Sequence, residues 1–306
     1  MEKSIKNIIL CGLGAVGAVY AEKLCQNRDI NFKVLVDKDR FERYSAQKIY
    51  FNNKPLNVEY ILPEETTFKA DLIIIATKMN GFSTALDEIK NFVYDNTVIL
   101  PLLNGVTSEQ IAAEIYGREK VLYSYFIGHS AVRVDNKITQ DGVSTLVFGS
   151  DNKGDEDKVK EVKALFDKCG VNYEIPKDIK RSLWLKFMLN VSSNPTTALF
   201  RLTFGQMLLD NKTMKLVTEL MKEVQLIAEA EGINNFQTMV NEAVEKLKTM
   251  SPEGKTSMLQ DIEAGRKTEY DVFTGAICRL GDKYNIETPY CDRLNKIFSI
   301  IDVSLK

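Results

Sequence analysis

A lysine and two asparagines recur every four residues in one apolar segment of the sequence. Lys186, Asn190 and Asn194 lie in LWLKFMLNVSSNPTTAL, residues 183–199. In a helix this spacing places an ammonium and two amides along one face, between apolar flanks. Such a lysine can stabilise negative charge on a carbonyl oxygen and donate a proton to it. A solvent-facing polar stripe explains the same spacing equally well, so both interpretations stay open at this point.

A second chemical motif lies near the start of the chain. The stretch ILCGLGAVGAVY, residues 9–20, holds a GxGxxG pattern between a predicted strand at 5–11 and a predicted helix at 15–27. In this pattern the first glycine permits a tight turn, the second lets a pyrophosphate approach, and the third allows close packing of helix on strand. The helix N-terminus offers N–H groups to phosphates. The predicted cofactor-binding residues are therefore Gly12, Leu13, Gly14, Ala15, Val16 and Gly17.

An acidic residue follows at the expected distance. Asp37 closes the next predicted strand, FKVLVD, 20 residues after Gly17. A carboxylate there accepts hydrogen bonds from the adenosine ribose hydroxyls and repels a 2′-phosphate. The motif therefore predicts a nicotinamide dinucleotide cofactor and favours NAD(H) over NADP(H).

Strand-like and helix-like segments alternate through the first half of the chain, which predicts a doubly wound parallel sheet. A small hairpin is expected about Asn52 and Asn53, and residues 121–148 are expected to add antiparallel strands at the edge of that sheet. The other predicted segments are strands at 72–77, 97–100 and 171–175 and helices at 82–93 and 108–116.

After Pro176 the strand signals almost vanish and helical patterns follow. Pro195 predicts a kink or break in the first of these helices. The fold class is therefore α/β, a Rossmann-type sheet domain at 1–177 followed by an all-helical substrate and dimerisation domain at 178–306. The predicted helical regions are 179–200, 212–231, 235–250, 257–285 and 291–303.

Composition limits the classes of partner that the chain is expected to bind. With 306 residues, 44% hydrophobic residues and a formal net charge of -2, it has no electrostatic reason to bind nucleic acid or an anionic membrane. Its N-terminus lacks the features of a signal peptide, so a cytoplasmic location is expected. The five cysteines are scattered without CxxC spacing, so no metal is expected. The one histidine, His129, is interpreted as a structural residue at a strand edge.

Five stretches in order resemble the ketopantoate reductase (2-dehydropantoate 2-reductase) family over essentially the whole chain: GLGAVG, ATK, LLNGV, LWLKFMLNVSSNPTTAL and SMLQDIEAGRKTE. The two long stretches are far more specific than the glycine pattern. The resemblance implies a Rossmann domain joined to a helical domain, and reduction of a 2-oxo acid with NADPH on the route to pantothenate. A homodimer is plausible for helical second domains of this kind.

The resemblance also implies roles for particular residues. Lys186 matches the family's catalytic lysine and Glu269 its active-site glutamate. Substrate is expected to bind Asn190, Asn194 and Ser257, and the cofactor Lys78 and Asn104 in addition to the glycine loop.

This chain departs from the family pattern at three positions. Asp37 stands where many members carry a basic group, although Lys38 and Arg40 lie nearby. Phe204 and Gly254 replace two asparagines on the substrate side. Loss of two amides and gain of a phenyl ring weaken recognition of a hydroxylated substrate and favour a more apolar 2-oxo acid.

Three functions are therefore weighed. The first is a ketopantoate reductase with Lys186 as general acid. The second is an NAD-dependent D-2-hydroxyacid dehydrogenase of the D-mandelate type, acting on branched or aromatic 2-oxo acids, which Asp37 and Phe204 favour. The third is a non-catalytic NADH-binding regulator, against which the retention of both Lys186 and Glu269 counts.

Overall fold

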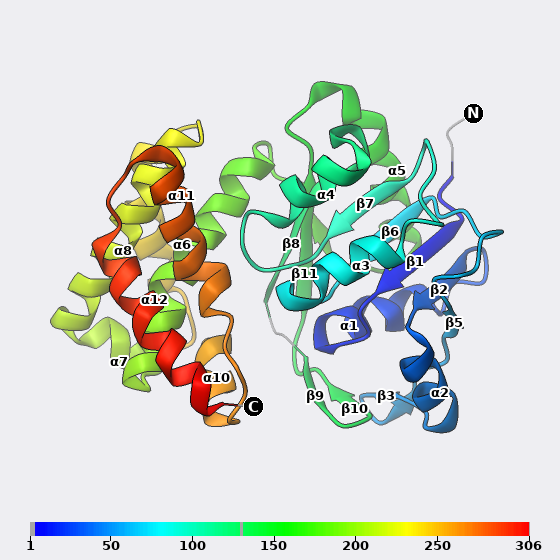
Figure 1. Ribbon diagram of the computed structural model, residues 1–306, viewed down its shortest axis with the longest axis horizontal. Coiled ribbons are helices and arrows are strands. Elements are labelled where there is room, and N and C mark those ends of the chain that lie inside the picture. The colour runs from blue at the N-terminus through cyan, green and yellow to red at the C-terminus, as the bar shows by residue number, and fades with distance from the viewer. Residues whose placement is uncertain (1–3, 129–130, 306) are drawn as a thin grey trace. The chain divides into compact units, whose positions relative to one another are not determined.

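The computed structural model describes residues 4–128 and 131–305, so His129 lies outside the described residues. The chain divides into two compact units, residues 1–179 and 180–306 (Figure 1). No helix in the described ranges is long and apolar enough to cross a membrane.

A five-stranded sheet of all-parallel strands forms the centre of the first unit, in the order β5-β2-β1-β6-β7. The chain runs outward from β1 in one direction and returns to its other side for β6, which makes the β1–β6 boundary a topological switch point. The predicted fold class is confirmed. The strands are β1 (Asn7–Cys11), β2 (Asn31–Leu35), β5 (Glu59–Ile61), β6 (Leu72–Ile75) and β7 (Val98–Pro101).

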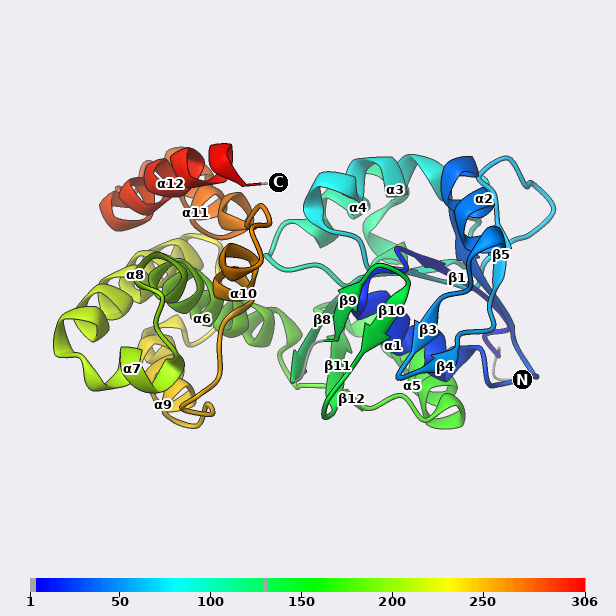
Figure 2. The same cartoon turned by 90° about the horizontal axis from the view of Figure 1, so that it is seen from below.

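Helices cover both faces of this sheet (Figure 2). Ile8 and Leu10 of β1 face one core with α1 (Ala15–Leu24) and α5 (Glu156–Cys169). The alternate residues Ile9 and Cys11 face a second core with α3 (Phe82–Glu88) and α4 (Ser108–Tyr116). Burial on both faces explains why these strands read as continuous apolar runs. Helix α2 (Lys38–Ala46) and three short 3₁₀ helices complete the helical part: η1 (Met79–Gly81), η2 (Arg118–Lys120) and η3 (Lys153–Asp155).

Two smaller sheets carry the remaining strands of this unit. The predicted hairpin is confirmed, with both turn residues, Asn52 and Asn53, at positive φ. The prediction that residues 121–148 add antiparallel strands to the edge of the main sheet is wrong. Val121 makes a single parallel bridge to Ile99 of that sheet, whereas the strands of this stretch pair with one another and with other short strands. One sheet holds β4 (Lys54–Pro55), β3 (Tyr50–Phe51), β10 (Lys137–Thr139) and β9 (Val132–Val134); the other holds β12 (Tyr173–Glu174), β11 (Ser144–Gly149) and β8 (Tyr123–Gly128).

The described residues of the second unit form helices joined by loops, with no strand among them. The short helix α7 (Phe204–Leu209) is not among the predicted helices. Its cap is polar, with Thr203 and Gln206 forming a reciprocal capping box. The other elements are α6 (Ile179–Phe200), α8 (Asn211–Ala230), η4 (Phe236–Thr238), α9 (Met239–Lys248), α10 (Ser257–Glu263), η5 (Asp271–Gly275), α11 (Ala276–Tyr284), α12 (Pro289–Ile301) and η6 (Asp302–Ser304).

Helix α6 continues through Pro195 to Phe200, so the break predicted there does not occur. Proline removes one backbone donor, but the hydroxyls around it satisfy nearby carbonyls. Thr196 donates to the carbonyl of Ser192 at 2.7 Å, and Thr197 donates to that of Ser193 at 2.7 Å. Tertiary packing holds the helix, because every residue from Val191 to Ala198 is buried.

Candidate active site

Two of the three motif glycines are required by the packing of the protein itself. Gly12 has a φ of +92°, and a Cβ there would lie 2.7 Å from the carbonyl oxygen of Ala76. A Cβ on Gly17 would lie 1.9 Å from the carbonyl oxygen of Gly12. Only glycine fits either position, because the loop turns tightly and α1 packs closely against it.

Gly14 is different, because its surroundings leave room. A Cβ there would have no heavy atom within 4 Å, and its φ of -82° is open to any residue. Gly14 is the N-cap of α1 and contributes no side-chain hydrogen bond to the first turn. The protein's own packing does not explain this glycine, whereas a phosphate bound close to the backbone does.

A buried polar atom lies beside this loop. Thr77 follows β6, and its Oγ1 is buried without a hydrogen-bond partner among the described residues. The preceding residue, Ala76, is the one that approaches Gly12. Buried hydroxyls without partners are rare in proteins and call for a ligand or an ordered water. The glycine loop and this orphaned hydroxyl together fit a bound dinucleotide.

The other predicted cofactor residues lie at the same edge of the sheet. The last residues of neighbouring strands are paired, Cys11 with Leu35 and with Ile75, and Ile75 with Pro101. The glycine loop, Asp37, Lys78 and Asn104 each follow one of these strand ends. In open α/β sheets ligands bind outside the carboxyl ends of the strands. Lys78 is exposed and Asn104 is half-buried.

Asp37 has a structural role that its sequence position did not reveal. It is the N-cap of α2, and its Oδ1 accepts a hydrogen bond from the backbone N of Arg40 at 2.6 Å. Its Oδ2 pairs with Nη1 of Arg40 at 2.8 Å. A carboxylate and a guanidinium therefore stand together just after β2, and both are substantially exposed.

Glu109 is a buried acid that sequence analysis missed. It lies in the first turn of α4, directly after the loop that carries Asn104, and is 2% exposed. Ser108 Oγ donates to its Oε2 at 2.9 Å and the backbone N of Ser124 donates to its Oε1 at 3.3 Å. Burial raises the pKa of Glu109 from 4.5 to about 7, against the lowering effect of hydrogen bonds. A single glutamate in a first helical turn carries no sequence signal for this.

This burial predicts a pH dependence of folding stability. The folded protein holds the Glu109 proton more tightly than the unfolded chain. The stability it contributes is complete below about pH 4.5 and is lost as pH rises through about 7. The loss amounts to at most about 3 kcal/mol. Glu109→Gln is expected to remove it, which urea unfolding at about pH 5 and pH 8 checks. Glu114→Gln, exposed on the same helix, is the control, and equal pH dependence in wild type and Glu109→Gln would contradict the assignment.

In the second unit three predicted substrate residues form one hydrogen-bonded group. Asn194 is only 4% exposed. Its Oδ1 accepts from Ser257 Oγ at 3.0 Å and from the backbone N of Met258 at 3.2 Å. Its Nδ2 lies 3.4 Å from Oδ1 of Asn190. The row of polar side chains on α6 therefore ends at a buried asparagine that holds the first turn of α10. This row is not a solvent-facing stripe.

The two predicted catalytic residues lie in the same unit. Lys186 is half-buried on α6, one turn before Asn190. Glu269 is half-buried in the segment between α10 and η5, where its carbonyl accepts from the backbone N of Val272 at 3.0 Å. An ammonium, two amides and a hydroxyl on α6 and α10 can hold a carboxylate and protonate a nearby carbonyl oxygen.

The two substrate-side departures from the family pattern lie against each other. The backbone N of Phe204 donates to the carbonyl of Gly254 at 3.0 Å. A Cβ on Gly254 would lie 3.1 Å from Cδ2 of the Phe204 ring. The carbonyl oxygen of Ser251 lies nearer still, at 2.9 Å, so this backbone atom and the Phe204 ring both restrict a side chain at position 254.

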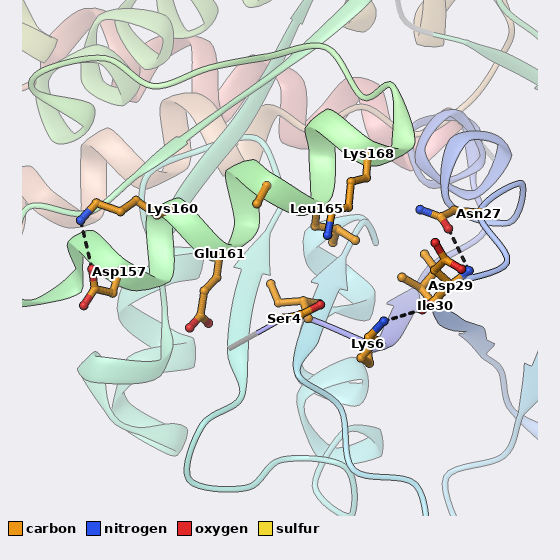
Figure 3. Close-up of a pocket in the computed structure, with 12 residues that line it drawn as sticks. Ser4, Lys6, Asn27, Asp29, Ile30, Asp157, Lys160, Glu161, Leu165 and Lys168 are labelled. Atoms are coloured by element: carbon orange, nitrogen blue, oxygen red, sulfur yellow. Dashed lines mark hydrogen bonds and ion pairs between the residues drawn. The ribbon is translucent and has the colours of Figure 1, made fainter. Parts of the chain in front are cut away.

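A pocket of about 580 Å³ lies elsewhere in the first unit (Figure 3). Lys6 and Asp29, which precede β1 and β2, line it together with residues of α5 such as Lys160 and Lys168. It is therefore at the amino ends of the strands, opposite the edge that carries the glycine loop. None of the predicted site residues lines it.

Comparisons with known proteins agree with this architecture. Residues 8–153 match the family described as Ketopantoate reductase PanE/ApbA, and residues 178–301 match Ketopantoate reductase PanE/ApbA C terminal. The 2-dehydropantoate 2-reductase of Aquifex aeolicus is 27% identical over 299 residues, which cover 96% of this chain and 96% of that protein.

Two solved structures share the fold. The ternary structure of D-mandelate dehydrogenase with NADH and anilino(oxo)acetate has a TM-score of 0.85 at 23% identity, covering 97% of this chain and 98% of the other. The dimeric ketopantoate reductase from Staphylococcus aureus has a TM-score of 0.77 at 20% identity, covering 97% of this chain and 99% of the other. With both halves matched, the chain belongs to the ketopantoate reductase family of nicotinamide-dependent oxidoreductases.

Proposed function

We propose that this protein reduces the 2-oxo group of ketopantoate to pantoate, with Lys186 as general acid. The observation that carries the proposal is the hydrogen-bonded group of Asn190, Asn194 and Ser257 beside Lys186 on α6. Bound NADH or NADPH would supply the hydride. The glycine loop, Lys78 and Asn104 are the proposed cofactor-binding residues.

Each substrate-side residue has a role that its chemistry suits. Hydride delivery to C2 of a 2-oxo acid builds negative charge on the carbonyl oxygen, which the Lys186 ammonium stabilises and then protonates. The amide of Asn190 is proposed to donate to the substrate carboxylate. The Ser257 hydroxyl is proposed to join it by turning away from Asn194 Oδ1, to which it donates at 3.0 Å in this structure. Glu269 is proposed to orient Lys186 or to receive a substrate hydroxyl.

A specific observation favours a second substrate. Phe204 and Gly254 stand where the family resemblance implies two substrate-side asparagines, and the Phe204 ring lies against Gly254, so an apolar ring replaces two amides that could bind a hydroxyl. A D-2-hydroxyacid dehydrogenase acting on branched or aromatic 2-oxo acids is therefore the second candidate. It shares the proposed mechanism and differs only in the substrate side chain.

Initial rates of NADH oxidation with ketopantoate, 2-oxoisovalerate and phenylglyoxylate, measured in one assay, test both candidates. The highest kcat/KM with ketopantoate supports the biosynthetic reaction, and preference for an apolar oxo acid supports the dehydrogenase. Binding of NADH without turnover of any 2-oxo acid would contradict both and indicate a regulator.

Cofactor preference gives a further prediction. We propose that Asp37 accepts the ribose hydroxyls and that NADH is preferred. Asp37→Arg is expected to shift the ratio of kcat/KM values for NADPH and NADH at least about tenfold toward NADPH, because it replaces repulsion of a 2′-phosphate by attraction. Steady-state kinetics with both cofactors checks this.

The control for this variant separates charge from capping. Loss of the α2 cap costs about 1 kcal/mol of stability by itself. Asp37→Ser keeps a capping oxygen and removes the charge. It is therefore expected to lose discrimination between NADH and NADPH without loss of folding stability. Asp210→Arg changes the N-cap of α8 and is expected to leave selectivity unchanged. Equal selectivity in wild type and Asp37→Arg would refute the ribose assignment.

We also propose a homodimer. One solved relative is dimeric, and the last helical segment of this chain carries apolar side chains spaced by three residues, Ile297, Ile300 and Val303, which are 39%, 73% and 85% exposed. Light scattering of the purified protein tests the proposal against the monomer mass of 34.7 kDa.

A further inference from the structure

Arg133 reaches the glycine loop from a distant strand. It lies on β9, in the β9–β10 hairpin, and is half-buried. Its Nη1 donates a hydrogen bond to the carbonyl oxygen of Leu13, the residue between Gly12 and Gly14. Its Nε donates to the carbonyl of Asp135 at 2.9 Å. The hairpin and the loop are therefore joined through one guanidinium.

An aromatic side chain of α2, Tyr44, holds this guanidinium in place. The same Nη1 lies 3.4 Å from Oη of Tyr44, and the guanidinium carbon lies 5.5 Å from the centroid of the Tyr44 ring. Tyr44 is buried and packs on Tyr60, with ring centroids 5.7 Å apart. Arg133 therefore touches the glycine loop on one side and, on the other, the helix that Asp37 begins.

The charge of Arg133 is not neutralised within the described chain. Its hydrogen bonds go to two carbonyl oxygens and a phenol, and no carboxylate in the described ranges pairs with it. A half-buried cation without an anion is costly unless a negative group joins it. The charge stands beside the loop in which a Cβ on Gly14 would have no heavy atom within 4 Å.

The hydrogen bond to Leu13 also sets the direction of an N–H group. The carbonyl of Leu13 and the N–H of Gly14 belong to one planar trans peptide and point in opposite directions. Holding the carbonyl oxygen on Arg133 therefore turns the Gly14 N–H away from Arg133. N–H groups fixed in advance bind an anion without the cost of ordering the loop.

We propose that Arg133 is a positioning residue for the pyrophosphate of the dinucleotide: it fixes the Leu13–Gly14 peptide and provides uncompensated positive charge beside it. This role rests on the proposed use of NADH or NADPH. The ligand class is a nucleoside diphosphate. The role predicts a contribution to the binding of phosphate-containing ligands that does not extend to adenosine.

Binding measured without substrate tests the role. Dissociation constants for NADH, ADP-ribose and adenosine are measured by fluorescence and by displacement, with Arg133→Met, Arg133→Lys and wild-type protein. Arg133→Met is expected to raise the dissociation constants of NADH and ADP-ribose at least about tenfold, and that of adenosine less than about twofold. Arg133→Lys keeps the charge but lacks the planar guanidinium, so its loss of affinity for NADH and ADP-ribose is expected to be smaller.

Arg43 supplies a matched control. Its guanidinium lies 5.2 Å from the centroid of the same Tyr44 ring, but it is exposed on α2 and is not bonded to Leu13. Arg43→Met is expected to bind all three ligands like the wild type. The affinity of wild-type protein for ADP-ribose is expected to fall more steeply with salt than that of Arg133→Met.

Three results would overturn the role. Unchanged affinity of Arg133→Met for ADP-ribose overturns the role of Arg133 and leaves the proposed function standing. Equal loss for adenosine and ADP-ribose, with a lowered Tm in both Arg133 variants, indicates that Arg133 only holds the hairpin. Wild-type protein that binds neither NADH nor ADP-ribose overturns the proposed function and this role with it.

Discussion

Lys186→Ala is expected to lower kcat for 2-oxo acid reduction at least about a hundredfold while leaving the Kd for NADH within about twofold of wild type. The lysine is proposed to act on charge that develops on the substrate oxygen in the transition state, so its loss is expected to appear in kcat. NADH is proposed to bind residues at the carboxyl edge of the sheet, in the other structural unit. Stopped-flow reduction and fluorescence titration measure the two quantities separately.

Two further variants show whether charge or proton donation is lost. Lys186→Arg keeps a cation that does not give up its proton at ordinary pH, so it is expected to retain substrate affinity and remain at least about tenfold slower than wild type. Lys180→Ala removes another half-buried lysine of α6 and is expected to keep wild-type kcat. A fully active Lys186→Ala protein would remove this residue from the mechanism.

The second large effect is expected at the glycine loop, where two neighbouring glycines respond differently to the same change. Gly17→Ala places a Cβ 1.9 Å from a backbone oxygen. Because a backbone atom cannot rotate away, α1 must move relative to β1, at a cost of about 3 kcal/mol or more. We expect a large loss of stability in urea unfolding and, with it, loss of NADH binding.

Gly14→Ala is the matched variant. Its Cβ meets no protein atom within 4 Å, and its φ is permitted for alanine. Stability is therefore expected to change by less than about 1 kcal/mol, while NADH affinity falls at least about tenfold because the methyl group occupies space proposed for the pyrophosphate. Unchanged NADH affinity in a folded Gly14→Ala protein would place the phosphates elsewhere.

Several features were predictable from local sequence, and each has a local physical cause. The apolar runs of β1 and β6, the glycine loop and the helix after it follow from side-chain periodicity and from glycine's backbone freedom. The change from alternating strands and helices to helices alone also shows in the sequence, because it changes the period of the apolar residues. Family-specific stretches identified Lys186, Asn190, Asn194, Ser257 and Glu269 as site candidates.

Other features depend on residues that are distant in the chain. Asn194 meets Ser257 63 positions later, and Arg133 meets Leu13 across 120 positions. Periodicity describes how one segment presents its own side chains and says nothing about which segment packs against it. Pairing of β8 with β11, in a sheet separate from the main one, was unpredictable for the same reason.

The sequence by itself therefore determined the fold class, the loop with its glycines and the identity of the polar residues on α6. Only the tertiary structure decided which glycine is free for a ligand, that Asp37 caps a helix and pairs with Arg40, and that Phe204 fills the space beside Gly254. It also decided that Glu109 is buried. Each of these properties is a matter of the space and charge around a residue, and both are supplied by segments that its local sequence does not contain.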